Sequence, residues 1–498
     1  MRRFRSTATI AVLRRWMGAA LVLAALARPG DVRAGEPPKP APTLQGAVAN
    51  LVARLQADTA AQVGVHVVRL SDGATLCSVN AARPMLPASN QKILTSAVAL
   101  KRLGADFSFH TQLAASGDDL VVYGDGDPTT GDSRLASAAN ETIYEVLDRW
   151  VDTLKAKGVA AVPGNLVIQT GIFQPPMAHP DWPIGQRQRW YSAPVAGVNF
   201  NDNCLDISFV YSGKSVQARV EPASRFLAID NRVKPGKRSA WSCRFADGLA
   251  KVTLLGTVSK NATGCLAVPD PPTLFGKVLA DRLALGGIEL GGKVLVSADP
   301  ARMRPDKKPE VLVTETTPLS AALGRCNKYS LNMMAECLFL RSAVADDAPA
   351  TWERAAEVAR KVLTGQYGLP ADQFVVADGS GYSRRNRASP ACITALLRAL
   401  AGEPAFVKSL AVAGVDGSLE DRLTTLGARG RILGKTGSLA GASALSGYVT
   451  DEGGQCVLAF SILVNGRTYG KKTSARATQD AICRTLIQAV DAAAPARK

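Results

Sequence analysis

Hydrophobic and polar positions in the first hundred residues predict a helix, a hairpin and a second helix. Residues 46–55 place apolar side chains at helical intervals, which indicates an amphipathic helix. Within residues 63–79, two Val-rich stretches flank the turn sequence Ser-Asp-Gly, which is typical of a β-hairpin. Residues 89–102 again follow helical spacing, so we expect a second helix there.

The chain beyond residue 312 shows the same mixture of patterns. Its closing segment, 473–494, places Ile482, Leu486 and Val490 at four-residue intervals, which indicates a helix with one core-facing side. Further helices are predicted at 318–326, 331–341 and 351–363, and strands at 431–439, 443–450 and 455–464.

The segment from about 113 to 311 is different. It is rich in Gly, Pro and short runs of Val, Leu and Ile, and strand patterns dominate it. Such strands are predicted at 120–123, 166–169, 207–211 and 251–257. We therefore expect a mixed α/β domain interrupted by one or two β-rich inserted domains.

The N-terminal residues have the pattern of an export signal. Arginines precede an apolar run at 17–27, and Val32-Arg33-Ala34 supplies small residues for cleavage, so residues 1–34 are predicted to be removed. A membrane anchor is the alternative, but the run is shorter than the ~20 apolar residues that span a bilayer. We expect a periplasmic protein, soluble or peripherally attached to the membrane. Arg14-Arg15 leaves twin-arginine export open beside the general secretory route.

Composition and charge narrow the function only slightly. Hydrophobic residues make up 47% and charged residues 20% of the chain, as in an ordinary globular protein. The formal charge is +17, and the seven Arg and one Asp of residues 1–34 leave about +11 on the remainder. This charge suits a polyanionic neighbourhood such as cell wall or anionic lipid, although a basic solvated surface explains it equally well. The sequence has no nucleic-acid-binding motif, so no nucleic-acid partner is expected.

Nine cysteines are spread along the chain, and none forms a C-x-x-C pair. A structural zinc site is therefore not expected, and no other metal motif is present. An exported chain can form disulfides. Cys243 and Cys265, which flank a strand-like stretch, are the best candidates for a pair.

Three short motifs stand in order along the chain. Ser89-Asn90-Gln91-Lys92 has the form S-x-x-K, Ser330-Leu331-Asn332 the form S-x-N, and Lys435-Thr436-Gly437 the form K-T-G. They fall at a predicted helix start, between two predicted helices and on a predicted strand. Together they are the signature of class A β-lactamases and penicillin-binding proteins.

The spacing of these residues has a chemical reason. Ser89 and Lys92, three apart, share one face of a helix, and a serine hydroxyl is a poor nucleophile without a nearby base. A lysine can be that base where burial and a second cation, here Lys435, lower its pKa from ~10.4. Ser330 adds a hydroxyl that can relay a proton to a leaving amine. Asn332 adds an amide that can hold the substrate or Lys92.

Each motif alone has a purely structural explanation. Ser89 or Ser330 could be a helix cap and Lys435 a solvated strand residue, so only their joint occurrence indicates chemistry. The chain has three histidines and no G-x-S-x-G sequence, which argues against a Ser-His-Asp triad.

The whole sequence resembles the D-alanyl-D-alanine carboxypeptidase/endopeptidase family of low-molecular-mass, class C penicillin-binding proteins, the penicillin-binding protein 4 type. The specific clue is the gap of 238 positions from Lys92 to Ser330, where this family carries a large insertion and β-lactamases do not. The other matching stretches are 124–129 (GDGDPT), 192–195 (SAPV), 378–384 (DGSGYSR), 414–419 (GVDGSL) and 435–447, which ends in SALSG.

The resemblance implies an α/β (α+β) serine transpeptidase or β-lactamase-like domain with a central antiparallel sheet, interrupted by nested β-rich domains. Residues 35–112 and 312–498 would form this penicillin-binding domain. Residues 113–195 and 272–311 would form inserted domain II, itself interrupted by inserted domain III at 196–271.

The resemblance also implies the reaction, which needs no cofactor. Ser89 attacks the carbonyl between two D-alanines, or in a D-centred cross-bridge of peptidoglycan, and water hydrolyses the acyl-enzyme. The backbone N–H groups of Ser89 and Ser438 form an oxyanion hole. Thr436 and Ser438 bind the terminal carboxylate beside Lys435, and Gly437 allows close backbone approach. β-Lactams acylate Ser89 because they resemble the substrate.

Two positions depart from the family pattern. The family usually has an Asp that reads the amine of a diaminopimelate side chain, and here Gln169 holds that place in Gln-Thr-Gly-Ile-Phe. The preferred diamino acid is therefore open. Arg384 matches a family arginine near the same pocket, with a surface arginine as the alternative. Ser438 follows the K-T-G motif where the family favours Thr, so the hydroxyl is kept.

Two other functions compete with a D,D-peptidase. A β-lactamase is opposed by the large insertion and by the lack of an identifiable deacylating Glu. A non-catalytic cell-wall-binding protein is compatible with the basic charge and with Gln169. Peptidoglycan peptides are the expected partners and β-lactams the expected covalent inhibitors. Contact with the membrane or with other wall enzymes, the oligomeric state and the balance of the two peptidase activities stay open.

Overall fold

The computed structural model describes residues 43–299, 309–345 and 348–493. One domain is built on a six-stranded sheet in which every neighbouring pair is antiparallel. The sheet joins distant parts of the chain, because Gln62 pairs with Asn465 and Arg69 with Leu458. Its strands, in spatial order, are β18 (Ala411–Val412), β19 (Ile432–Leu439), β20 (Ala442–Thr450), β21 (Cys456–Asn465), β1 (Gln62–Arg69) and β2 (Thr75–Val79).

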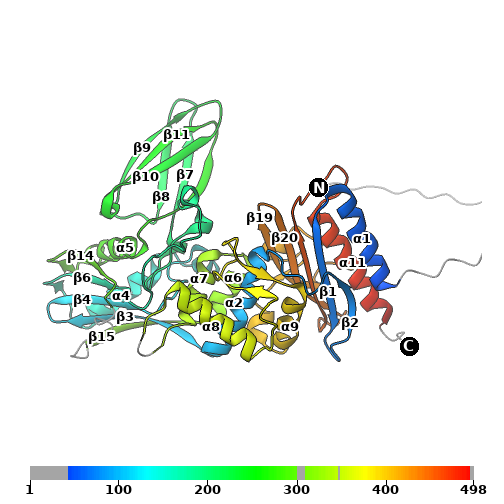
Figure 1. The fold of residues 1–498 in the computed structure, drawn as a ribbon. Coiled ribbons are helices and arrows are strands. Elements are labelled where there is room, and N and C mark those ends of the chain that lie inside the picture. The colour runs from blue at the N-terminus through cyan, green and yellow to red at the C-terminus, as the bar shows by residue number, and fades with distance from the viewer. Residues whose placement is uncertain (1–42, 300–308, 346–347, 494–498) are drawn as a thin grey trace, which may run out of the picture. The chain divides into compact units, whose positions relative to one another are not determined.

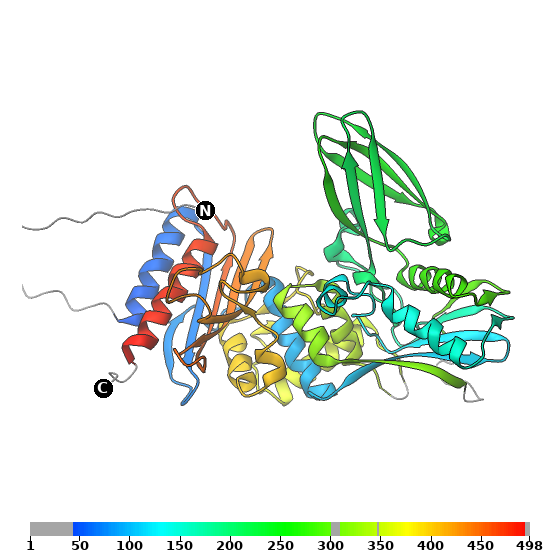
Figure 2. The same ribbon diagram turned by 180° about the vertical axis from the view of Figure 1, so that it is seen from behind.

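Helices cover both faces of this sheet (Figures 1 and 2). On one face, α1 (Leu44–Thr59) and α11 (Ala475–Ala493) pack side by side, and their apolar residues share a core with the strands. On the other face, α9 (Pro390–Leu400) lies against the sheet, and α2 (Gln91–Leu103) packs against α9. Around them pack α6 (Leu319–Lys328), α7 (Asn332–Arg341), α8 (Trp352–Gly365), α10 (Pro404–Val407) and the short pair β16 (Phe374–Val375) and β17 (Arg387–Ala388).

The inserted part contains three larger sheets. A five-stranded mixed sheet has the order β14 (Val294–Ser297), β6 (Leu166–Gln169), β4 (Asp119–Gly124), β3 (Ser108–Ser116) and β15 (Glu310–Pro318). One three-stranded sheet is β12 (Ala262–Ala267), β7 (Cys204–Tyr211) and β8 (Val216–Glu221), and the other is β10 (Ala240–Phe245), β11 (Lys251–Val258) and β9 (Ala228–Pro235). The remaining elements are α3 (Ser133–Ala138), α4 (Glu145–Ala156), α5 (Pro271–Leu285), β5 (Ala161–Val162) and β13 (Glu289–Leu290).

The helices and strands predicted in the outer parts of the chain are confirmed to within a few residues. One difference affects the predicted nucleophile, because the α-helix begins at Gln91 and Ser89 lies in the 3-10 turn Ala88–Asn90 before it. In the middle segment the β-rich prediction overlooked α4 and α5. The helix α4 buries Trp150 among other apolar residues at helical spacing.

The predicted disulfide is wrong. Cys243 lies on β10 and Cys265 on β12, in separate three-stranded sheets, and all nine cysteines are reduced. The predicted domain boundaries at 112 and 311 fall inside the paired strands β3 and β15, and the division into domains stays a prediction. Within the described ranges, no helix has both the length and the apolar character that a membrane span requires.

Candidate active site

Ser89 is presented by a tight turn that is fastened to the strand β19. Asn90, fully buried, donates from Nδ2 to the carbonyl of Lys435 at 2.7 Å and accepts from the hydroxyl of Ser446 at 2.6 Å. Ala88 has a left-handed backbone with φ of 46°. The turn therefore fixes the half-buried Ser89 side chain beside the K-T-G strand.

Lys92 is fully buried and points at Ser89. Its Nζ donates to Ser89 Oγ at 3.1 Å, to Asn332 Oδ1 at 2.7 Å and to the carbonyl of Ser380 at 2.9 Å. Burial lowers the pKa of Lys92 to about 8, even though nearby Cys326, Glu336 and Asp378 act in the opposite direction. A neutral amine next to the serine is therefore available at mildly alkaline pH.

Lys435 and Ser330 form a second pair on the opposite side of the site. The Nζ of Lys435 donates to Ser330 Oγ and to the carbonyl of Thr436, both at 2.8 Å. Burial, followed by the positive charge of Lys92, holds the pKa of Lys435 well below its usual value. Ser330 has a left-handed backbone (φ 62°) between α6 and α7, which turns its hydroxyl toward the lysine.

The strand β19 forms the next part of the site. Thr436 Oγ1 donates to Ser418 Oγ at 2.7 Å, and Ser438 is exposed. A Cβ on Gly437 would lie 3.0 Å from the backbone nitrogen of Ser89 and 3.0 Å from the carbonyl oxygen of Pro87. Only glycine lets the nucleophile turn lie this close to the strand.

The loop 378–386 closes the site behind Lys92. The buried carboxylate of Asp378 accepts from Gly381 N at 2.8 Å, Ser383 N at 2.5 Å, Asn386 Nδ2 at 2.8 Å and Trp182 Nε1 at 3.0 Å. A Cβ on Gly381, where φ is 85°, would lie 1.9 Å from the carbonyl oxygen of Ala88. Asp378 thus holds a glycine loop directly against the nucleophile turn.

Glu336 fixes the carbonyl that holds Lys92. It is fully buried on α7 and accepts from Gly379 N at 2.6 Å and Ser380 N at 2.9 Å. Burial, and then the nearby Asp378, raise the pKa of Glu336 to about 8. Since Ser380 donates its N–H to Glu336 and accepts from Lys92, the carboxyl sets the position of the lysine through one peptide unit.

Of the ten predicted site residues, two stand apart from the others. Arg384 is exposed and donates from Nη1 to the carbonyl of Ala440 at 2.9 Å, at the turn that follows β19. Gln169 is buried at the end of β6, where its Oε1 accepts from Gly171 N at 2.9 Å and its Nε2 donates to the carbonyl of Asp299 at 3.2 Å. These contacts of Gln169 lie within the inserted part.

Several residues around the site were missed. Asn90, Glu336 and Asp378 each contact at least one backbone group, and a backbone contact leaves no sequence motif. The stretch 378–384 was noted as a match, but no role was given to Asp378. The carbonyl of Tyr191 accepts from Asn332 Nδ2 at 2.7 Å, and this contact joins the inserted part to the S-x-N motif. Glu336 was the most accessible to prediction, because it lies four residues after Asn332 on the same helix.

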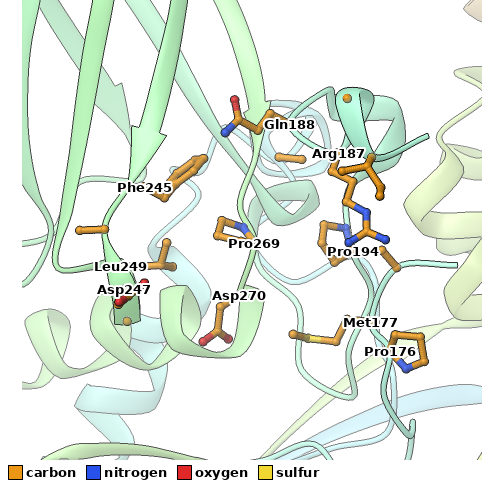
Figure 3. A pocket seen from close by; sticks show the side chains of 16 residues that line it. Pro176, Met177, Arg187, Gln188, Pro194, Phe245, Asp247, Leu249, Pro269 and Asp270 are labelled. Atoms are coloured by element: carbon orange, nitrogen blue, oxygen red, sulfur yellow. The ribbon is translucent and has the colours of Figure 1, made fainter. Parts of the chain in front are cut away.

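A separate pocket of about 810 Å³ lies within the inserted part. Figure 3 shows Met177, Arg187 and Pro194 on one side and Phe245 and Leu249 on the other. None of its lining residues is among the ten predicted site residues.

Comparison with known proteins identifies the chain. Residues 44–488 match the model of the D-Ala-D-Ala carboxypeptidase 3 (S13) family. The chain belongs to this family. The D-alanyl-D-alanine carboxypeptidase of Actinomadura sp. (strain R39) is 30% identical over 463 residues, which cover 87% of this chain and 82% of that protein. The protein is thus a D-Ala-D-Ala carboxypeptidase, a hydrolase of the penicillin-binding protein 4 type, and the predicted family is confirmed.

Solved structures have the same fold. Penicillin-binding protein 4 from Haemophilus influenzae superposes with a TM-score of 0.73 at 24% identity, over 89% of this chain and 98% of that one. Its complex with a novel β-lactam gives a TM-score of 0.68 at the same identity and coverage. The predicted fold class, an α/β domain with a central antiparallel sheet and inserted domains, is confirmed.

Proposed function

We propose that this carboxypeptidase is a serine D,D-peptidase that forms an acyl-enzyme on Ser89 and also acts as an endopeptidase on D-centred cross-bridges of peptidoglycan. The observation that carries the proposal is the hydrogen bond of 3.1 Å from Lys92 Nζ to Ser89 Oγ. A fully buried lysine with a lowered pKa is the kind of base that a serine nucleophile requires.

In the proposed acylation, neutral Lys92 takes the proton of Ser89 Oγ while that oxygen attacks the carbonyl carbon. The negative charge that develops on the carbonyl oxygen is stabilised by the backbone N–H groups of Ser89 and Ser438. The close approach allowed by Gly437 supports this arrangement, since it places the nitrogen of Ser89 against β19.

The C–N bond then breaks: the hydroxyl of Ser330 gives its proton to the leaving amine and takes up the proton that Lys92 removed from Ser89, so that Lys92 is neutral again. Its hydrogen bond with Lys435 supports this role. Thr436 and Ser438 are proposed to bind the carboxylate of the leaving D-alanine, with Lys435 supplying positive charge. Asn332 holds Lys92 in place. Water finally hydrolyses the ester, with Lys92 again as the base, and no cofactor takes part.

Arg384 and Gln169 are proposed to contact the rest of the substrate. The hydrogen bond from Arg384 to the carbonyl of Ala440, just after β19, supports this role. Gln169 is 2% exposed, so a contact with substrate would require its amide to leave Gly171 and Asp299.

The proposed place of action is the periplasm. Residues 1–34 are proposed as a cleaved export signal, and they lie outside the described residues. Peptidoglycan peptides would be the substrates there. β-Lactams are proposed to acylate Ser89, which the β-lactam complex of the Haemophilus influenzae protein supports.

The test compares the purified protein with Ser89→Ala on a pentapeptide monomer, on a cross-linked muropeptide dimer and with fluorescent penicillin. We expect wild type to release D-alanine, to cut the dimer and to become labelled, and Ser89→Ala to do none of these. Labelling that persists in Ser89→Ala would exclude Ser89 as the nucleophile. Rapid turnover of a chromogenic cephalosporin would instead favour a β-lactamase.

A further inference from the structure

A second pocket, of about 450 Å³, opens beside the K-T-G strand. Its near wall is Thr436, Gly437 and Ser438, and its far wall is the loop before α11 with the first turn of that helix. Because Thr436 and Ser438 are the proposed carboxylate ligands, the pocket begins where the leaving D-alanine ends. It therefore lies on the leaving-group side of the scissile bond.

The far wall of this pocket carries an unneutralised positive charge. Arg422 is 6% exposed, and Asp480 balances its charge at 2.6 Å. Arg476 also lines the pocket and is exposed, and its guanidinium has no hydrogen bond or ion pair within the described part of the chain. It lies in the first turn of α11, where the helix dipole disfavours a cation. Stabilisation of the helix therefore does not explain why an arginine occupies this position.

The loop at the rim is held in a fixed conformation. The carboxylate of Asp58 accepts from the backbone N–H groups of Lys472 at 2.8 Å and Thr473 at 2.7 Å. The first of these bonds is the main reason why the pKa of Asp58 is lowered to about 2. The same loop displays Tyr469, which lines the pocket with 71% of its surface exposed. An aromatic ring and a free arginine thus face the same space.

We propose that this pocket is a subsite for the second stem peptide of a cross-linked substrate. The inference rests on the proposed function and extends its endopeptidase part. In the carboxypeptidase reaction the leaving group is a single D-alanine, which ends at Thr436 and Ser438. In the endopeptidase reaction the leaving amine belongs to another peptide, which must continue past β19 and carries further carboxylates. Arg476 would bind those carboxylates, and Tyr469 would cover the aliphatic part of the peptide.

The volume and chemistry of the pocket agree with this occupant. About 450 Å³ lies within the range of roughly 300–1,000 Å³ found for small-molecule sites and is much more than an alanine methyl needs. Electrostatic complementarity between an exposed cation and an anionic ligand chiefly affects association and is weakened by salt. Cleavage of the cross-linked substrate should therefore depend on salt more strongly than cleavage of the monomer.

The test measures kcat/KM of the purified protein on a D,D-cross-linked muropeptide dimer and on a pentapeptide monomer. Arg476→Glu is expected to lower kcat/KM for the dimer about 5- to 10-fold and to leave the monomer within about 2-fold. Tyr469→Ala should also lower cleavage of the dimer selectively. A dimer whose acceptor carboxylates are amidated should lose the sensitivity to Arg476→Glu.

Arg360→Glu is the matched control, because Arg360 is exposed on α8 and does not line the pocket. It should leave both substrates unaffected. An equal loss on both substrates in Arg476→Glu, or no loss on the dimer, overturns the subsite. So does a wild type that cleaves the monomer but not the dimer. If wild type releases no D-alanine from the monomer, the proposed function fails first and the subsite fails with it.

Discussion

At the scale of single residues, burial decides the chemistry of Lys92. The side chain is completely removed from water, yet all three hydrogens of its charged form have acceptors, in Ser89, Asn332 and Ser380. Loss of hydration outweighs the nearby groups that favour the charge, so the pKa falls to about 8. These three contacts fix the position of the amine, which suits the proposed role of Lys92 as the base.

This pKa predicts the pH dependence of acylation. Below pH 8 Lys92 is mostly protonated and cannot accept the proton of Ser89, and above pH 8 it is mostly neutral. The second-order rate of labelling by fluorescent penicillin should therefore rise from pH 6, reach half of its maximum near pH 8 and level off above about pH 9. Lys92→Arg keeps a positive charge that cannot be removed, and we expect it to lower the rate about 10²- to 10⁴-fold. A flat profile for wild type would contradict Lys92 as the base.

The sequence was sufficient to predict which side chains meet at the centre. Lys92 contacts Ser89, as their spacing predicted, and Asn332, which was one of the two alternatives for that amide. The contact of Lys435 with Ser330 was not predicted. The groups that hold them were not predictable in the same way. The Ser380 carbonyl belongs to the peptide backbone, which every residue carries, so only the folded chain reveals its role.

At the scale of elements, the loop 378–386 holds Lys92 in position. Four N–H donors converge on Asp378, and one of them, from Trp182, comes from the inserted part of the chain. Rings extend this contact, since Trp182 packs edge-on against Tyr382 at 5.6 Å and Tyr382 against Tyr191 at 5.5 Å. These contacts therefore link the inserted part to the loop that positions Lys92.

Asp378→Asn should weaken the hydrogen bonds that hold the loop 378–386. The amide has one oxygen and one NH2 group, so its NH2 group would face donors that now have a carboxylate oxygen as acceptor. A buried polar group left without a partner costs about 1–3 kcal/mol. We expect the free energy of unfolding in urea to fall by that amount, together with the rate of penicillin labelling. Asp372→Asn, at an exposed position before the loop, is the control and should change neither. Unchanged stability of Asp378→Asn would show that the four contacts do not support the loop.

Periodicity explains which elements were predictable. The outer helices and strands have strong patterns because each one buries a single face. The helix α4 also buries one face, through Leu147, Trp150, Val151 and Leu154. It was missed because short strands and turns surround it in the sequence, and their patterns led to the β-rich prediction for that segment. The pairing of Cys243 with Cys265 failed because closeness in sequence does not tell which sheet a strand joins.

At the scale of the whole molecule, the catalytic sheet depends on contacts between distant parts of the chain. The strand β1 lies between β2, its neighbour in sequence, and β21, near the other end of the described chain. The two three-stranded sheets of the inserted part use more local pairs, such as β7 with β8 and β10 with β11. Because non-local pairing is slow, the catalytic sheet should be completed after these two sheets.

Refolding from urea should show this order. We expect far-UV circular dichroism to recover before the protein regains the ability to react with fluorescent penicillin, since reactivity requires β19 against the Ser89 turn. Native protein in the same residual urea is the control for the labelling step. Simultaneous recovery of both signals would contradict this order.

The pairing of β3 with β15 bears on how such a chain can arise. Ser108 lies opposite Pro318, so the long segment between them leaves and re-enters the catalytic domain at neighbouring strands. In the topology of the chain, this segment amounts to an enlarged hairpin loop between two antiparallel strands. Doubling the length of a loop costs only about 0.6 kcal/mol in closure entropy. A lineage could therefore acquire or exchange material at this point in its gene, and so alter how substrates are selected, while the reactive centre is inherited unchanged.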